Sequence, residues 1–267
     1  MVLHMNNLEK NAKAVGSILC FGIDPVEGKI KSARNELDER IEEYYFSITD
    51  LLISESQIVA IKPNYAFFAQ YGFEGLHALK SIVDRYRGKV EIIFDGKRGD
   101  IGKTSEAYAR EIFDFWGADA LTVSPYMGED SVKPFLRSGK IVYMLCKTSN
   151  RGANDFQELE CNGKKLYEHV AHKSIEWKTG LVVGATSDSI KRIAEITNGK
   201  VPFLIPGIGA QGGDLNMVMS AIKKNPYIHR INASSSIAFA YEKRGLSPEQ
   251  SALAEAKDLN SHIRKYL

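Results

Sequence analysis

Residues 90–118, VEIIFDGKRGDIGKTSEAYAREIFDFWGA, contain the transition on which the fold prediction rests. They begin with an apolar, β-rich run that ends at Phe94, pass through a charged, glycine-rich stretch, and continue as a helix-like segment at 103–118. The apolar run is continuous rather than alternating, which is typical of a parallel strand covered by helices. The segment therefore predicts one β/α unit with charged residues at the carboxyl end of its strand.

The same alternation recurs along the whole chain. Apolar, β-rich runs occur at 17–24, 57–64, 90–97, 119–126, 140–147, 180–187, 201–209 and 227–235. Helix-like segments occur at 33–54, 73–88, 103–118, 129–139, 164–180, 188–199, 213–225 and 247–267. The last begins with Ser247-Pro248, a helix-start pattern, and the fourth is the weakest because it contains Pro134. These alternations predict an α/β fold, a (β/α)8 TIM barrel, as a single domain over residues 1–267.

Polar residues recur where the predicted strands end. They are Asp24, Lys62, Asn64, Asp95, Lys97, Ser124, Lys147, Thr148, Ser149, Thr186 and Asn232, together with Pro206 and the glycines that follow it. Active sites of such barrels lie at the carboxyl ends of the strands. A polar residue at each strand exit predicts one shared mouth that holds a site.

The bulk composition narrows the function classes. The chain has 267 residues, 44% hydrophobic and 25% charged, which is ordinary for a globular protein, and its net charge of +2 gives no argument for a nucleic-acid polymer as partner. Cys20 and Cys146 lie in apolar runs, Cys161 is isolated, and no Cys/His spacing suggests zinc. No apolar stretch has the length of a signal peptide or a membrane span. We expect no membrane association and a cytoplasmic location.

The charged run at 95–100 has two interpretations. Charged residues are mostly exposed, so the run could be a solvated loop, and Thr104 could serve only as a helix cap. Its position at a strand exit instead favours a catalytic array, because Asp95 directly follows the apolar run and should project into the mouth. Glycines at 96, 99 and 102 would let the backbone turn tightly and approach a ligand.

The segment FDGKRGDIGKTSEAY resembles the signature of orotidine 5'-phosphate decarboxylases, D-x-K-x-x-D-I-x-x-T. It carries the D-G-K-R-G-D-I-G-x-T form found in the longer-looped branch of that family, and the match comprises Asp95, Lys97, Asp100, Ile101 and Thr104. Further family landmarks follow the same order along the chain: FGIDP with Asp24, IKPN with Lys62, and PGIGAQGGD as a phosphate loop. The resemblance covers nearly the whole predicted barrel.

The resemblance implies a decarboxylase of de novo pyrimidine biosynthesis that converts orotidine 5'-phosphate to uridine 5'-phosphate and CO2 without metal or organic cofactor. Lys97 would be the proton donor at carbon 6, and an ammonium there also stabilises the carbanion-like charge. Asp95 and Asp100 would hold Lys97 in place and keep it charged. Lys62 would complete the array Lys62–Asp95–Lys97–Asp100.

The resemblance also implies a homodimer with shared active sites, because Asp100, Ile101 and Thr104 reach into the neighbouring subunit's site in this family. The implied substrate-binding residues are Asp24, Asn64, Ile101, Thr104, Ser149, Pro206, Gly209, Gln211, Gly212, Ser234 and Ser235. GIGAQG, residues 207–212, also fits a dinucleotide-binding pattern, but it follows the seventh predicted strand, where barrels commonly bind phosphate.

One position departs from the family pattern. An arginine is expected after the eighth strand, but INASSSIAFA has Ser235 there. A hydroxyl cannot replace a permanently charged fork. Either another cation takes over, with Arg230, Arg98 and Arg151 as candidates, or phosphate binding is weakened, or the arginine has been substituted deliberately.

Two other functions remain open at this point. One is a related barrel decarboxylase or aldolase that acts on a sugar phosphate with a magnesium ion; Lys62 and Lys97 count against it, because cations beside the carboxylates oppose a metal. The other is a non-catalytic nucleotide-binding barrel, made plausible only by Ser235.

Overall fold

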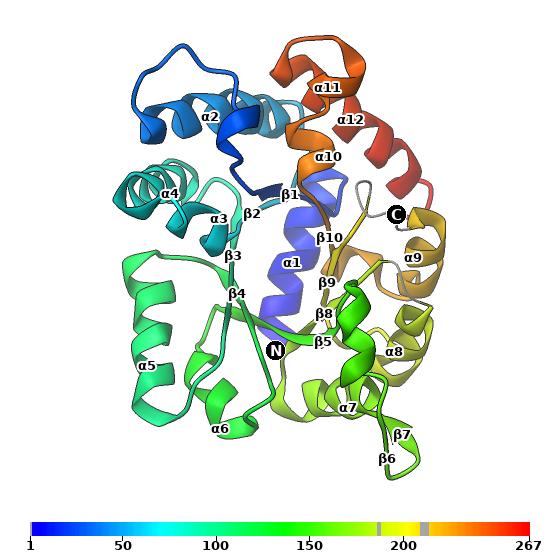
Figure 1. Cartoon of the computed structure of the whole chain (residues 1–267). Coiled ribbons are helices and arrows are strands. Elements are labelled where there is room, and N and C mark those ends of the chain that lie inside the picture. Colours follow the sequence, from blue (N-terminus) through cyan, green and yellow to red (C-terminus); the bar gives the residue numbers. More distant parts are fainter. Residues whose placement is uncertain (1, 186–187, 209–213) are drawn as a thin grey trace.

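The computed structural model describes residues 2–185, 188–208 and 214–267, which form a closed barrel of eight parallel strands (Figure 1). The strands are β1 (Leu19–Ile23), β2 (Ala60–Pro63), β3 (Glu91–Arg98), β4 (Ala120–Val123), β5 (Ile141–Lys147), β8 (Gly180–Val183), β9 (Phe203–Pro206) and β10 (Arg230–Ala233). Around the barrel they follow the order β1, β10, β9, β8, β5, β4, β3, β2, and β2 pairs with β1 to close it. Each predicted strand is present, so the barrel prediction is confirmed.

Helices surround the strands. They are α1 (Val2–Val15), α2 (Leu37–Ser54), α3 (Tyr65–Ala69), α4 (Gly72–Tyr86), α5 (Gly102–Arg110), α6 (Glu129–Val132), α7 (Leu166–Trp177), α8 (Ser189–Thr197), α9 (Leu215–Ile222), α10 (Ser235–Ala238), α11 (Tyr241–Arg244) and α12 (Pro248–Ile263). Short 3-10 helices lie at Glu27–Lys29, Lys133–Phe135, Arg151–Asp155 and Pro226–Ile228, and a π-helical segment, Glu111–Phe115, continues α5. The antiparallel hairpin of β6 (Glu160–Cys161) and β7 (Lys164–Lys165) lies in the connection after β5.

The helix predictions are confirmed where capping residues and helix propensity agree, and the observed helix is shorter than predicted where a proline interrupts the segment. Ser247 caps α12 as expected: its side chain accepts a hydrogen bond from the Gln250 N–H, and Pro248 occupies the first turn. The predicted helix at 129–139 shrinks to α6 and a 3-10 turn, because Pro134 lacks an N–H and its ring clashes with the preceding turn. The short helices α3, α10 and α11 fill connections for which no separate helix is predicted.

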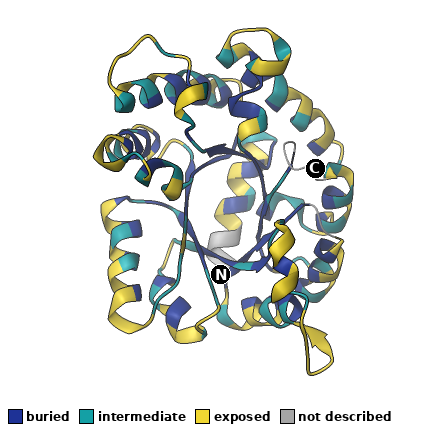
Figure 2. Cartoon of the chain, in the orientation of Figure 1, coloured by how far each residue is buried: buried dark blue, intermediate teal, exposed yellow. Residues whose placement is uncertain are grey.

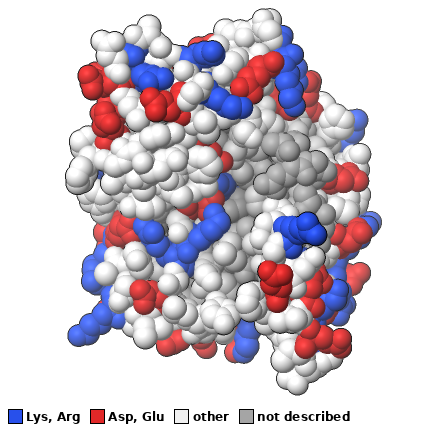
Figure 3. Space-filling model, in the orientation of Figure 1, with Lys and Arg blue, Asp and Glu red and all other residues white. Residues whose placement is uncertain are grey.

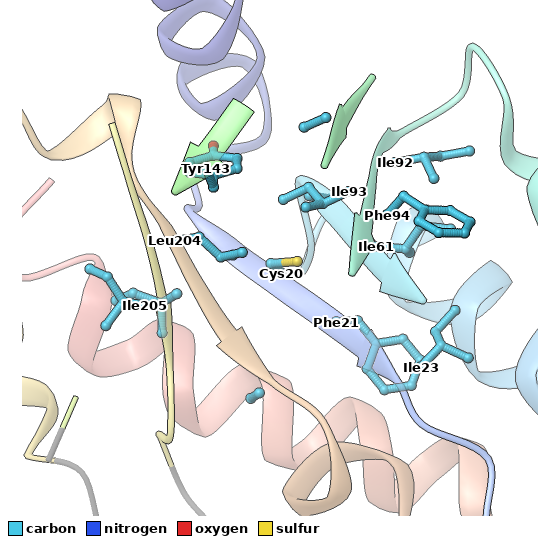
Figure 4. Close-up of a cluster of buried hydrophobic side chains, with 14 of the residues drawn as sticks. Cys20, Phe21, Ile23, Ile61, Ile92, Ile93, Phe94, Tyr143, Leu204 and Ile205 are labelled. Carbon is cyan, nitrogen blue, oxygen red and sulfur yellow. The ribbon is translucent and has the colours of Figure 1, made fainter. Parts of the chain in front are cut away.

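Alternate residues of the strands face the barrel interior and the helices. In the cluster of Figure 4, Ile93 and Phe94 of β3 point to opposite sides of the strand. Phe94 packs on Tyr65 of α3 and on Trp116, with ring centroids 5.6 Å and 5.8 Å apart. Figure 2 shows the result for the residues coloured by burial: the strands and the inward faces of the helices are buried, and the outward faces of the helices are exposed.

A buried ion pair lies at the amino end of the barrel. Arg230, the first residue of β10, donates from Nε to Oε2 of Glu91, the first residue of β3, over 2.8 Å, and both side chains are buried. Arg230 Nη2 also donates to the Leu8 carbonyl of α1 at 3.1 Å. These contacts hold α1 against the amino end of the barrel.

Among the described residues, no helix is both long and apolar enough to cross a membrane.

Candidate active site

A cavity of about 360 Å³ opens at the carboxyl ends of the strands. Its lining residues come from strand ends and from the connection after β5: Lys62, Asp95, Lys97, Thr122, Leu145, Thr148, Ser149, Asn150, Val182, Leu204 and Pro206. Its floor is apolar and its charged groups are concentrated at β2 and β3. The face drawn in Figure 3 carries basic and acidic side chains next to one another near its centre.

Asp95 lies between two lysines. Lys62 Nζ is 2.7 Å from Asp95 Oδ2, and Lys97 Nζ is 2.6 Å from Asp95 Oδ1. The Lys62 and Asp95 side chains are buried, whereas the Lys97 side chain remains 49% exposed. The Lys97 ammonium is therefore held by Asp95 and still reachable from the cavity.

The charges in this group stabilise one another. Burial disfavours the Lys62 ammonium, but the nearby carboxylates of Asp95 and Asp24 outweigh burial and raise the pKa of Lys62 above its usual value. Burial also disfavours the Asp95 carboxylate, yet Lys62 and Lys97 outweigh it and hold the pKa of Asp95 well below the usual carboxyl range. Lys62 and Asp95 are therefore both charged at neutral pH.

The backbone of β3 makes this pairing possible. The register against β4 shifts between Phe94 and Arg98, so residues 95–97 form a bulge. Within it Lys97 takes φ +44°, a left-handed conformation that is costly for a residue with a side chain. The sequence suggested that Gly96, Gly99 and Gly102 would let the backbone turn tightly. Of these, Gly102 is left-handed at φ +49°, and the other left-handed residue of this stretch is Lys97 itself.

Thr122 of β4 faces the bulge and was not predicted as a site residue. Its Oγ1 accepts a hydrogen bond from the Lys97 backbone N–H at 3.0 Å and donates one to Asp95 Oδ1 at 2.8 Å. Thr122 was overlooked because it lies inside an apolar run. The feature of the sequence that could have identified it is its inward-facing position one residue before the end of the strand.

Asp100 does not meet Lys97 within one chain. Its Oδ1 accepts a hydrogen bond from the backbone N–H of Ile101 at 2.8 Å, and no ion pair joins it to a described lysine or arginine. Ile101 is 58% exposed, and Thr104 is exposed in the first turn of α5. The expectation that Asp100 positions Lys97 is therefore not met within a single copy, and Thr104 is not the residue that caps α5, because that place belongs to Ile101.

Asp24 and Ser234 lie near Lys62: the Asp24 carboxylate contributes to the raised pKa of Lys62, and Ser234 lies against Gly22, the residue of β1 that pairs with Lys62. A Cβ on Gly22 would come within 1.9 Å of Ser234 Oγ, so glycine is required for β1 to pass β10 here. Asp24 Oδ1 is buried without a hydrogen-bond partner among the described residues, and so is Asn232 Oδ1, whose Nδ2 donates to Ser234 Oγ at 3.2 Å. These free acceptors suit hydroxyl donors of a ligand. Asn232 was noted at a strand end but not assigned to the site.

Asn64 and Ser149 flank the cavity at two other strand ends. The backbone of Asn64 bridges that of Asp95, which places Asn64 next to the group formed by Lys62, Asp95 and Lys97.

Ser149 lines the cavity from the connection after β5. A Cβ on Gly184 would lie 2.9 Å from the backbone nitrogen of Ser149, so a glycine at 184 lets this connection approach β8. The connection is fixed by Gln157, whose Oε1 accepts from the Thr148 N–H at 2.8 Å, and by the 3.1 Å ion pair of Lys147 with Glu158.

The expected phosphate side is described in part. Pro206 lines the cavity, while Gly209, Gln211 and Gly212 lie outside the described residues, as does Thr186. Ser235 is exposed at the start of α10. It lines a separate cavity of about 250 Å³ together with Lys29, Lys243 and Arg244.

The structure separates the arginines considered as substitutes at this position. The prediction that Arg230 could replace the missing arginine is wrong, because its guanidinium is fully buried against Glu91 at the opposite end of the barrel. Arg98 is committed elsewhere: it bonds Glu111 at 2.8 Å and lies over the rings of Tyr65 and Tyr108, 4.6 Å and 4.8 Å from their centroids. Arg151 is exposed in the connection after β5.

Comparisons with known proteins agree with this geometry. The family model described as "Orotidine 5'-phosphate decarboxylase / HUMPS family" matches residues 19–245. The chain is 43% identical over 233 residues to an orotidine 5'-phosphate decarboxylase of Dechloromonas aromatica, covering 84% of this chain and 85% of that protein.

Solved structures of similar proteins have the same fold. The OMP decarboxylase structure of Leishmania donovani superimposes with a TM-score of 0.79 at 33% identity, covering 98% of this chain and 99% of that one. The UMP synthase structure of the same organism gives a TM-score of 0.78 at 33% identity; the match covers 98% of this chain, which spans 56% of the length of that protein.

Proposed function

Because this chain belongs to the orotidine 5'-phosphate decarboxylase / HUMPS family, we propose that it converts orotidine 5'-phosphate to uridine 5'-phosphate and CO2. The reaction is a step of pyrimidine nucleotide synthesis, and the enzyme is a carboxy-lyase. Residues 1–267 would act as one catalytic domain in the cytoplasm. The identity over most of both chains supports this choice within the family.

The observation that carries the proposal is the Lys97 ammonium, 2.6 Å from Asp95 and accessible from the cavity. When the bond from carbon 6 to the carboxylate breaks, CO2 leaves and the electron pair stays on carbon 6. An adjacent ammonium stabilises that charge as it develops and then gives its proton to the carbon. Lys97 is left neutral and regains a proton from water.

Asp95 and Lys62 would hold the Lys97 ammonium in the position from which it can donate its proton. The Asp95 carboxylate holds the Lys97 ammonium at 2.6 Å, and Lys62 contacts the second oxygen of Asp95 at 2.7 Å, so Asp95 remains ionised beside a substrate that is itself anionic. Asp95 would also face the substrate carboxylate, a repulsion that ends as CO2 departs. The low pKa of Asp95 supports this arrangement.

The substrate would lie across the mouth with its ring over Lys97. We assign the ribose hydroxyls to Asp24, Lys62 and Asn64, because the buried Oδ1 of Asp24 lacks a partner among the described residues. Ser149 would read the pyrimidine edge. The phosphate would be bound by Pro206, Gly209, Gln211, Gly212, Ser234 and Ser235.

A second copy of the chain would complete the site. Asp100, Ile101 and Thr104 would enter the partner's mouth, with Asp100 and Thr104 at the ribose and Asp100 beside the partner's array. The exposure of Ile101, and of Tyr126 and Met127 in the connection after β4, supports an apolar contact at this rim. The protein would then be a homodimer with two shared sites.

Turnover of orotidine 5'-phosphate in excess chelator tests the proposed function. We expect undiminished formation of uridine 5'-phosphate, because the charges at Asp95 are already balanced by Lys62 and Lys97. A metal-dependent barrel enzyme would instead lose activity on its sugar phosphate, and a binding barrel would give no product. Absence of turnover with and without magnesium would overturn the proposal.

A further inference from the structure

The catalytic lysine is held in a backbone conformation that it would not adopt alone. Lys97 lies at φ +44°, and left-handed backbone is disfavoured for residues that carry a Cβ. Such a conformation persists only where surrounding contacts determine it. The contacts that determine it here therefore set where the ammonium lies.

Thr122 supplies those contacts. β3 pairs with β4 at Phe94↔Leu121 and again at Arg98↔Val123, so the bulge at 95–97 stands opposite Thr122. The ordinary ladder cannot serve the Lys97 N–H in this bulge, and Thr122 Oγ1 accepts from it at 3.0 Å. Thr122 is 1% exposed, so water does not compete for this hydrogen bond.

The same hydroxyl also fixes the carboxylate. Its proton goes to Asp95 Oδ1 at 2.8 Å, the oxygen that the Lys97 ammonium contacts at 2.6 Å. One oxygen atom thus joins the backbone of the lysine to the carboxylate that holds its side chain. A methyl group in its place would leave the Lys97 N–H without a partner and remove a donor from Asp95.

We propose that Thr122 is a positioning residue for the decarboxylation: its hydroxyl holds the β3 bulge so that the Lys97 ammonium stays against Asp95 and over the reacting carbon. This inference rests on the proposed function. Thr122 lines the cavity, but its hydroxyl is engaged by the Lys97 N–H and by Asp95, and the role assigned to it acts through these two residues.

The test compares Thr122→Val, which keeps the shape, with Thr122→Ser, which keeps the hydroxyl. We expect Thr122→Val to lower kcat about a hundredfold, as for a small misplacement of a catalytic group. KM should stay within about threefold, because the residues assigned to the ribose, the pyrimidine edge and the phosphate are not altered. Thr122→Ser should stay within about fivefold of wild-type kcat. Thr49→Val is the matched control, since Thr49 is buried in α2 and its Oγ1 has no partner among the described residues.

A second readout separates positioning from general loosening of the fold. In a Lys97→Ala background, Thr122→Val should lower the remaining rate by less than about threefold, because the group that Thr122 positions is gone. A full hundredfold loss in that background, or a Thr122→Ser variant as slow as Thr122→Val, would overturn the proposal. If Thr122→Val does not fold, Thr122→Ala gives the same comparison with less steric demand.

The crystal structure of Thr122→Val keeps the inference testable if wild type proves inactive on orotidine 5'-phosphate. We expect the Lys97 backbone to leave the left-handed region or the Lys97–Asp95 contact to lengthen. An unchanged bulge and contact would contradict the positioning role, whatever the substrate of the wild-type protein.

Discussion

At the scale of the residue, Lys97 combines two properties that rarely occur together. Its ammonium is tied to a buried carboxylate, yet about half of the side chain remains open to the cavity. Asp95 can hold this charge without being neutralised by a proton, because Lys62 contacts its other oxygen. The arrangement orders the ammonium that we propose as proton donor before substrate arrives, which is the condition for electrostatic stabilisation without reorganisation.

Replacing Lys97 by alanine removes both the stabilising charge and the proton. We expect Lys97→Ala to lose about three decades of kcat/KM or more, measured as uridine 5'-phosphate formed from orotidine 5'-phosphate. The fold should survive, since the side chain is 49% exposed. Lys191→Ala, on the surface of α8, serves as the control. Near-normal turnover of folded Lys97→Ala would remove Lys97 from the mechanism.

Ser235 gives a second prediction at this scale. An arginine at this position would add a charge-assisted fork for phosphate, so Ser235→Arg should lower KM for orotidine 5'-phosphate at least about tenfold, equivalent to 1.4 kcal/mol. The phosphate-free nucleoside orotidine should change little, and Ser235→Gln, long but neutral, should not reproduce the gain. Equal improvement on both substrates, or none, would show that Ser235 does not lie at the phosphate.

Residue identities at the mouth could be predicted from the sequence, but their conformations could not. Lys62, Asp95 and Ser149 stand at strand exits, and the structure brings all of them to one cavity. The left-handed Lys97 and the hydroxyl of Thr122 depend on the register shift between β3 and β4, which no local pattern encodes. Arg230 was misjudged because an inward-facing residue at the start of a strand points to the barrel floor and not to the mouth.

At the scale of the element, the amino end of β10 is held by the buried side chains of His229, which is neutral, and Arg230, which is charged. His229 precedes β10, is buried, and accepts a hydrogen bond through Nδ1 from the Phe203 N–H of β9 at 3.0 Å. Burial, assisted by the neighbouring Arg230 guanidinium, lowers the pKa of His229 to about 3. His229 is therefore neutral in the folded protein.

The low pKa of His229 makes stability depend on pH. Between about pH 6.5 and pH 3 the unfolded chain binds a proton at His229 that the folded chain does not, so this contribution to stability is lost as pH falls. At pH 5 the loss is about 2 kcal/mol relative to pH 7. His229→Asn keeps an acceptor and removes the titration, so its free energy of unfolding should fall less between pH 7 and pH 5.

Urea denaturation at both pH values and one protein concentration measures the difference. An equal fall in wild type and variant would contradict the assignment.

Element positions could be predicted better than element lengths. Continuous apolar runs marked all eight barrel strands, because both faces of such a strand are buried. The helix after β4 was shortened by Pro134, and α1, a polar segment at the start of the chain, was not predicted as a helix. The α1 helix is held by tertiary contacts such as Arg230 with the Leu8 carbonyl, and contacts of that range leave no local signal.

At the scale of the whole molecule, one copy of the chain connects three of the four charged residues of the proposed array. Lys62, Asp95 and Lys97 form a connected group, while Asp100 turns to its own backbone at Ile101. The exposed Ile101 lies beside it. A second copy that presents its Asp100 would complete the alternation of charges, and the account as a whole therefore rests on a site built from two chains.

Hybrid dimers of Lys97→Ala and Asp100→Ala test that claim most directly. Each variant alone should be nearly inactive. After dissociation and random reassociation, half of the dimers are mixed, and each mixed dimer has one site with both lesions and one with neither. Activity on orotidine 5'-phosphate should then recover to about a quarter of wild type per total site. No recovery, despite subunit exchange demonstrated with a size-tagged copy, would mean that each site belongs to a single chain.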